Sequence, residues 1–204
     1  PLAATTARRG FAVTGFDVDP QKIDNINAGV SYIDAVSQEA MTDAAAKGGL
    51  DATTDFAGLR DMDVIIICVP TPLNSQREPD LSYVEDTTRT IAQHITKDTL
   101  VVLESTTYPG TTDEVLRPIL ETSGLTPGTD IFLGFSPERE DPGNSQFNTK
   151  SIPKVVAGDG EGAGADGRVV RLIVREIRAF VDVLGDHRRG AWLKDADEGA
   201  EGLL

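Results

Sequence analysis

The feature that most constrains the fold is the alternation of short apolar runs with amphipathic stretches over the first 135 residues. The apolar runs have the length of strands and the stretches between them have helical spacing, which is typical of a parallel sheet with crossover helices. We expect strands at residues 11–16, 65–69, 100–104, 131–135 and 154–157. We expect helices at residues 21–28, 37–47, 83–95 and 111–121. The pattern predicts an α/β, Rossmann-like, doubly wound parallel sheet.

Composition excludes several classes of function. The formal charge of -14 and the pI near 4.5 argue against nucleic acid and anionic membranes as partners. No stretch has the apolar length of a membrane span, and no signal segment opens the sequence. A single cysteine, Cys68, cannot form an internal disulfide, which favours a cytoplasmic protein. Because Cys68 lies in the apolar run DVIIICV, we expect it to be buried as part of the core and not to act as a nucleophile.

The sequence divides into two parts at about residue 160. Residues 1–160 carry the α/β pattern, whereas residues 158–167 are rich in glycine, as linkers are. Apolar residues recur at helical spacing over residues 170–184, with arginines between them, and residues 186–204 have no period and are expected to be poorly ordered. We interpret residues 161–204 as a divergent tail, which either arose by a shift of reading frame or is natural.

The first candidate site residue is Asp17, at the end of the predicted first strand. In dinucleotide-binding folds a carboxylate at this place accepts hydrogen bonds from the adenosine ribose and disfavours NADP. Strand ends also carry Asp as the cap of the next helix, so this position alone decides nothing. The sequence opens with a helix start at residues 1–4. It contains neither the strand nor the Gly-x-Gly-x-x-Gly loop that usually precede a ribose-binding carboxylate of this kind. We therefore expect a sheet that lacks its first strand, which would lie at its centre.

Two polar loops follow predicted strands at the same edge of the sheet. Residues 104–112 (ESTTYPGTT) place hydroxyl and backbone N–H groups where ligands bind in such folds. Residues 135–144 (FSPEREDPGN) include Glu138, a possible general base or a group that orients a water molecule. A threonine-rich helix cap and a solvated acidic turn are the alternative interpretations. The presence of both loops at one edge favours a site.

Together with residues 69–73 (VPTPL) and 78–84 (EPDLSYV), these loops resemble the UDP-glucose/GDP-mannose dehydrogenase family. Within the family the sequence is most similar to the branch that oxidises UDP-N-acetylhexosamines, such as UDP-N-acetyl-D-glucosamine or -mannosamine. The resemblance covers residues 1–160 and implies a partial NAD-binding Rossmann domain.

The resemblance also implies which residues bind the cofactor NAD. Asp17 would bind the adenosine ribose, and Lys22 would lie near the same end of NAD. Pro70 and Thr71, in the Pro-Thr-Pro loop, and Thr107 would line the cofactor cleft. No metal site is expected.

For the substrate, a UDP-sugar, the resemblance implies a further set of residues. Glu138 matches the glutamate that positions water and substrate during hydrolysis of the covalent intermediate, and Thr107 is the second candidate catalytic residue. Arg139 and Glu140 lie in the loop whose backbone approaches the sugar nucleotide.

The family reaction oxidises the C6 alcohol through an aldehyde to a carboxylate with two NAD+, and yields uronates for polysaccharide biosynthesis. A cysteine of a later domain captures the aldehyde, and water cleaves the resulting thioester. That cysteine and the UDP-binding domain have no counterpart here, and Cys68 lies in the wrong place to replace it. We therefore expect a fragment of a homodimeric or larger enzyme that is inactive by itself.

Two alternatives remain. One is a non-catalytic remnant that binds only a nucleotide or a partner subunit. The other is a different Rossmann enzyme, such as a 3-hydroxyacid dehydrogenase, which would lack the Ser-Pro-Glu-Arg loop.

Overall fold

The computed structural model describes residues 2–8, 10–33, 36–46, 49–75, 77–137 and 157–159. Its α-helices are α1 (Leu2–Arg8), α2 (Pro20–Asn27), α3 (Gln38–Ala46), α4 (Ser82–His94) and α5 (Arg117–Leu120). Its strands are β1 (Val13–Phe16), β2 (Leu50–Thr53), β3 (Val64–Ile67), β4 (Leu100–Leu103), β5 (Phe132–Phe135) and β6 (Ala157–Asp159). The shorter helical segments are η1 (Phe56–Asp61), η2 (Thr112–Leu116) and η3 (Glu121–Ser123).

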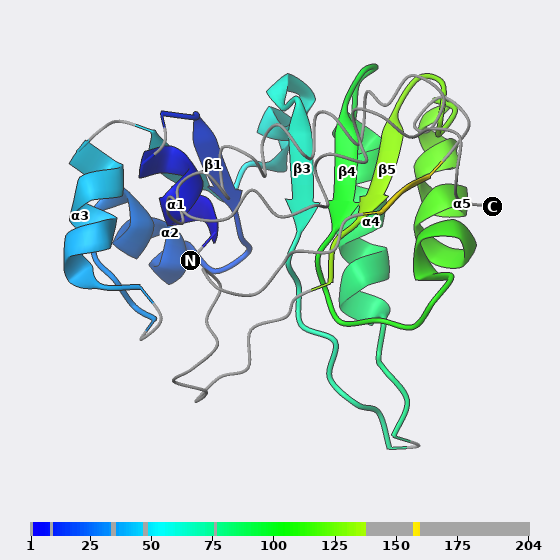
Figure 1. Cartoon of the computed structure of the whole chain (residues 1–204), viewed down its shortest axis with the longest axis horizontal. Helices are drawn as coiled ribbons and strands as arrows, with labels where there is room; N and C mark the ends of the chain where they lie inside the picture. The colour runs from blue at the N-terminus through cyan, green and yellow to red at the C-terminus, as the bar shows by residue number, and fades with distance from the viewer. Residues whose placement is uncertain are drawn as a thin grey trace, which may run out of the picture.

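The strands form two sheets. One is the parallel pair β1–β2, and the other has the order β3-β4-β5-β6, in which only β6 is antiparallel to its neighbour. Figure 1 shows β1 between α1, α2 and α3 on one side and the β3–β6 sheet with α4 and α5 on the other. Within the described residues β1 and β3 do not pair, so the sheet is interrupted between them, and we call this interruption the seam. The expected α/β fold with parallel strands is confirmed.

Local sequence explains how β1 leads into α2. Asp19 caps the helix, because its carboxylate accepts a hydrogen bond of 2.9 Å from the backbone N–H of Gln21. Pro20 occupies the first turn, where a missing N–H costs nothing. The helix gives way to Gly29, whose φ of 66° favours glycine. These residues fix Asp17 directly between a strand end and a helix start.

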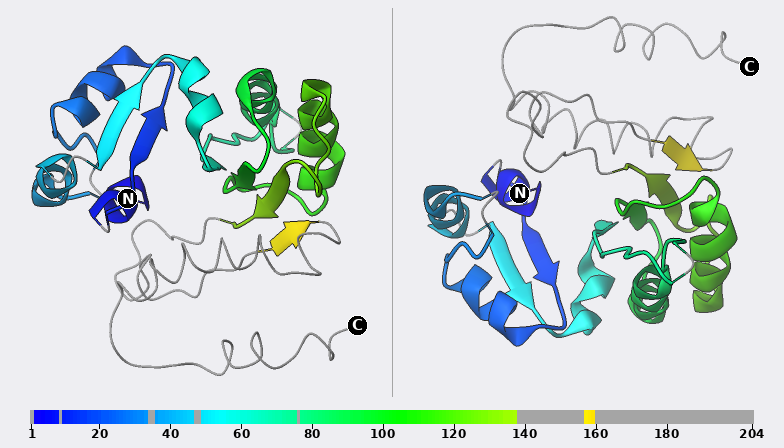
Figure 2. Two further views of the ribbon diagram at one scale, coloured as in Figure 1. Left: turned by 90° about the horizontal axis from the view of Figure 1, so that it is seen from above. Right: turned by 90° about the horizontal axis from the view of Figure 1, so that it is seen from below.

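The core is divided in the same way as the sheet. The larger cluster lies between β3–β5 and the helices α4 and α5, and it is made of Ile, Leu and Val side chains such as Ile67, Leu103 and Leu133. The smaller cluster joins α1 and α3 and includes Ala7, Met41 and Ala44. The rings of Phe16 and Phe56, with centroids 5.9 Å apart, pack where β1 meets η1. Figure 2 shows η1, in cyan, between the β1–β2 pair and the α4–α5 side.

The expectation that Cys68 is buried is wrong. Cys68 is exposed, and so is Ile66, which is 44% exposed. Successive side chains of a strand point to opposite faces, so Ile65 and Ile67 face the larger core whereas Ile66 and Cys68 face the other side. An apolar run alone predicted burial on both faces, but at the seam only one face is covered.

Two further differences concern helix and strand boundaries. The predicted helix over residues 111–121 is irregular: η2 is a π-helical turn, in which the N–H of Arg117 donates to the carbonyl of Thr112. Pro118 has no N–H to continue regular bonding, which accounts for the irregular turn beside it. Of the predicted strand over residues 154–157, Ala157 lies in β6, and residues 154–156 lie outside the described residues. In the part that the structure describes, no helix is long and apolar enough to cross a membrane.

Candidate active site at the carboxyl edge of the sheet

The carboxyl ends of β1, β3, β4 and β5 lie at one edge, since these strands point the same way in Figure 1. Polar residues follow each of them. Asp17 follows β1, Thr71 follows β3, Thr107 follows β4 and Ser136 follows β5. Ligands bind at this edge in open α/β sheets. The structure therefore brings the sequence-predicted Asp17, Thr71 and Thr107, together with Ser136, to a single edge.

Asp17 and Lys22 form an ion pair within the β1–α2 connection. The Lys22 ammonium donates to Oδ2 of Asp17 at 2.9 Å, and the backbone N–H of Asp19 donates to Oδ1, also at 2.9 Å. Burial alone would raise the pKa of Asp17, but these hydrogen bonds and the charge of Lys22 outweigh it, so the pKa is lowered. The pKa of Lys22 is raised, chiefly by its hydrogen bond to Asp17. Each carboxylate oxygen keeps a lone pair that can accept a ribose hydroxyl.

The lowered pKa of Asp17 makes stability depend on pH. Its contribution is full above the unfolded-state pKa of about 3.9 and is lost as pH falls through the lower folded-state pKa. We expect Lys22→Met to cost less than about 1 kcal/mol near pH 7, because the pair is partly exposed, and to cost nothing in strong acid. Urea unfolding at a series of pH values measures this, with Gln21→Met on the same helix as the control. A cost of Lys22→Met that does not change with pH would contradict the ion-pair account.

Hydroxyl groups join the loop after β3 to the loop after β4. The Oγ1 of Thr71 donates to the carbonyl of Thr106 at 2.7 Å, and the Oγ of Ser105 donates to the carbonyl of Val69 at 2.7 Å. Pro70, between them, is exposed. These bonds link residues about 35 positions apart and hold the Pro-Thr-Pro loop against the threonine loop, as a shared cleft requires.

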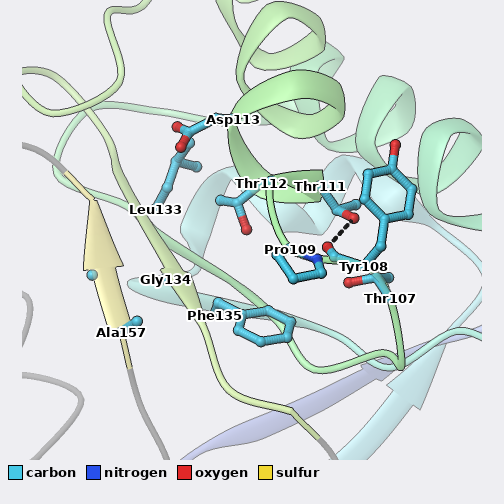
Figure 3. Close-up of a pocket in the computed structure, with 12 residues that line it drawn as sticks. Thr107, Tyr108, Pro109, Thr111, Thr112, Asp113, Leu133, Gly134, Phe135 and Ala157 are labelled. Carbon is cyan, nitrogen blue, oxygen red and sulfur yellow. Dashed lines mark hydrogen bonds between the residues drawn. The ribbon is translucent and has the colours of Figure 1, made fainter.

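A pocket of about 250 Å³ lies between the threonine loop and the ends of β5 and β6. Figure 3 shows Thr107, Thr112 and Phe135 around it, with the ring of Tyr108 turned away from Phe135. The hydroxyl of Thr111 donates to the carbonyl of Tyr108 at 2.7 Å and so serves the turn. The buried Oγ1 of Thr107 has no hydrogen-bond partner. An unsatisfied buried hydroxyl is costly, so it indicates a bound water or ligand.

Other candidate residues lie outside this geometry. Glu138, Arg139 and Glu140 lie outside the described residues, and their roles stay predictions. Ser136, which the sequence analysis did not select, has a buried Oγ without a hydrogen-bond partner. Its sequence signal is its place directly after an apolar strand, in the FSPEREDPGN segment. Among the described residues, no group of His, Cys, Asp or Glu side chains is arranged to hold a metal ion.

Comparison with known proteins shows which proteins the chain resembles. Residues 1–177 match the family model of the UDP-glucose/GDP-mannose dehydrogenase family, NAD binding domain. The UDP-N-acetyl-D-mannosamine dehydrogenase of Pyrococcus horikoshii is 34% identical over 182 residues, which are 89% of this chain and 42% of that protein. The GDP-mannose 6-dehydrogenase of Pseudomonas putida is 36% identical over 186 residues, covering 87% of this chain and 41% of that protein.

Solved structures give the same result. The UDP-D-ManNAc dehydrogenase structure from Pyrococcus horikoshii matches with a TM-score of 0.75 at 32% identity, over 88% of this chain and 41% of that chain. A ternary complex of GDP-mannose dehydrogenase from Pseudomonas aeruginosa matches with a TM-score of 0.70 at 30% identity, over 85% and 41%. The chain thus spans about two fifths of the length of these relatives.

Proposed function

Since this chain belongs to the UDP-glucose/GDP-mannose dehydrogenase family and matches its NAD-binding domain, we propose that it is part of a nucleotide-sugar 6-dehydrogenase. The enzyme oxidises the C6 alcohol of a UDP-N-acetylhexosamine to a uronate for polysaccharide biosynthesis. The observation that carries this proposal is the convergence of Asp17, Thr71 and Thr107 on one edge of the sheet, with the buried Thr107 hydroxyl unsatisfied.

The residues at this edge fit NAD. The carboxylate of Asp17 is positioned by Lys22 and by the Asp19 backbone, and it accepts the ribose hydroxyls. In this proposal Pro70 and Thr71 line the cofactor cleft, and the Oγ1 of Thr107 supplies a donor that nothing in the described structure uses. Bound NAD accepts the hydride. The residues of this chain bind and orient it and keep the adenosine end fixed.

A UDP-N-acetylhexosamine is the favoured substrate because residues 69–73, 78–84, 104–112 and 135–144 together resemble that branch of the family. Relatives named for UDP-N-acetyl-D-mannosamine and for GDP-mannose have similar identity to the chain, so GDP-mannose is the competing substrate. Both substrates carry an anionic diphosphate, and neither the pocket beside Thr107 nor the one beside Glu78 and Asp80 is lined by Lys or Arg.

The test of this proposal uses a protein that joins this chain to the remaining part of the Pyrococcus horikoshii relative. We expect two NADH per uronate formed with a UDP-N-acetylhexosamine, and little reaction with GDP-mannose. Glu138→Gln should release two NADH per active site in one burst and then accumulate the sugar thioester, visible in intact-protein mass spectra, because hydrolysis of the thioester needs an oriented water.

Glu140→Gln is the control, since only the backbone at that position is expected to approach the sugar. Preference for GDP-mannose would overturn the substrate assignment. Normal turnover of the Glu138→Gln protein would remove Glu138 from the catalytic residues. A protein that folds but binds no NAD would favour the alternative of a non-catalytic remnant.

A further inference from the structure

Three polar side chains lie in a row across the carboxyl ends of β3, β4 and β5. In the sheet Ile67 is paired with Leu103, and Leu103 with Phe135. The next residues of the three strands are Cys68, Glu104 and Ser136. The ladder continues through them, because the N–H of Glu104 donates to Ile67 at 2.9 Å and that of Ser136 donates to Leu103 at 3.0 Å. We call Cys68, Glu104 and Ser136 the edge row.

The edge row faces away from the larger core. Ile67 and Leu103 belong to that core and Phe135 packs against it. Side chains alternate between faces, so the edge row lies on the opposite face, on the same side as Ile66. Along the row, Cys68 is exposed, Glu104 is 7% exposed and Ser136 is 1% exposed. The row therefore leads from solvent at the seam to a buried hydroxyl.

The chemistry of Glu104 and Ser136 is specific. The buried Oγ of Ser136 has no hydrogen-bond partner and can donate one bond, while the Glu104 carboxylate can accept from an N–H group. Neighbouring strands are about 4.8 Å apart, so one planar group can reach both side chains. A carboxylate repels phosphate, and an unused hydroxyl donor does not select a cation. An amide group can use both side chains, because its N–H donates to the Glu104 carboxylate and its carbonyl accepts from the Ser136 hydroxyl.

We propose that Glu104 and Ser136 form a subsite for the carboxamide of the nicotinamide ring. This rests on the proposed NAD-binding function. A dinucleotide spans the edge of such a sheet, and Asp17, at the end of β1, takes its adenosine ribose. The other half then extends toward the ends of β3–β5, where the edge row lies. The acetamido group of an N-acetylhexosamine has related chemistry and is the competing source of an amide.

Cys68 provides an internal reporter, because it is the sole cysteine and marks the exposed end of the row. We expect NAD at saturation to slow the reaction of Cys68 with a disulfide reagent about tenfold, whereas ADP-ribose, which lacks nicotinamide, slows it little. UDP-N-acetylglucosamine should also slow it little.

In the Ser136→Ala and Glu104→Gln proteins, the affinity for NAD should fall about tenfold each, which is the effect of one lost hydrogen bond to a charged or buried group. The affinity for ADP-ribose should not change.

Ser136→Ala carries a second readout. Because the Ser136 hydroxyl has no partner in the free protein, its removal should leave the melting temperature of that protein unchanged or raise it. Ser123→Ala is the control, since its hydroxyl donates to Leu120 at the far end of α5. A lower melting temperature together with unchanged NAD affinity would make Ser136 structural and overturn the subsite.

The outcomes separate the two proposals. Equal protection of Cys68 by NAD and ADP-ribose would overturn the carboxamide subsite and leave NAD binding intact. Protection by UDP-N-acetylglucosamine alone would assign the row to the sugar amide and overturn the subsite as proposed. Calorimetry that detects binding of neither NAD nor ADP-ribose would contradict the proposed function itself.

Discussion

Replacing Ile67 by alanine is expected to lower the free energy of unfolding by about 2–5 kcal/mol, whereas Ile66→Ala should lower it by about 0.5 kcal/mol or less. The two residues are neighbours in β3 and have the same side chain, so strand propensity and composition cancel in the comparison. Ile67 is 2% exposed and packs in the larger core, while Ile66 lies on the open face beside the seam. Alanine at position 67 removes buried methyl groups and leaves a cavity, but alanine at position 66 removes surface that water already reaches.

Urea unfolding of the two variants, followed by circular dichroism, measures this difference. The pair also tests the divided sheet, because a β3 flanked by a partner on both sides and covered on both faces would bury Ile66 as fully as Ile67. Equal losses of stability for the two variants would contradict the open face and, with it, the exposure of Cys68.

Periodicity predicted most of the elements because their apolar residues recur with the spacing of strands and helices. It did not predict β2, whose sequence LDAT has only two apolar residues and no run. That strand depends on its partner β1 and on the side chain of Asn27, which accepts from the backbone N–H of Ala52 and donates to its carbonyl. Such tertiary contacts are not visible in a local pattern.

The prediction that Cys68 is buried was wrong for a related reason. A run of apolar residues predicts a strand covered on both faces. Whether the second face is covered depends on which strands and helices lie beside it, and this is a property of the whole fold.

At the candidate site, the sequence predicted where the loops lie but not how they are bonded. The motifs placed Thr71 and Thr107 at one edge, and the bond from Thr71 to the Thr106 carbonyl agrees with that placement. The unsatisfied hydroxyls of Thr107 and Ser136 could not be predicted, because hydrogen-bond satisfaction depends on atomic positions. Likewise, Lys22 was expected near the cofactor, and the structure adds that it holds the Asp17 carboxylate.

The largest effect on binding is expected at Asp17. Asp17→Ala should weaken NAD binding about 5- to 150-fold, the equivalent of about 1–3 kcal/mol for ribose hydroxyls left without their acceptor. The same carboxylate should disfavour NADP, because the 2′-phosphate replaces a donor hydroxyl with a dianion beside Asp17. The Asp17→Ala substitution removes this repulsion and leaves the charge of Lys22 in place. The variant should therefore bind NADP relatively better than the unchanged protein does. Asp24→Ala, on the exposed side of α2, is a suitable control.

Calorimetric titration of the chain with NAD and NADP tests most directly whether it is an NAD-binding domain built around the carboxyl edge of this sheet. We expect weak but measurable NAD binding, NADP binding weaker by about tenfold or more, and the loss of most of this preference in the Asp17→Ala protein. Equal affinities for NAD and NADP, or no binding of either to the folded chain, would contradict the account.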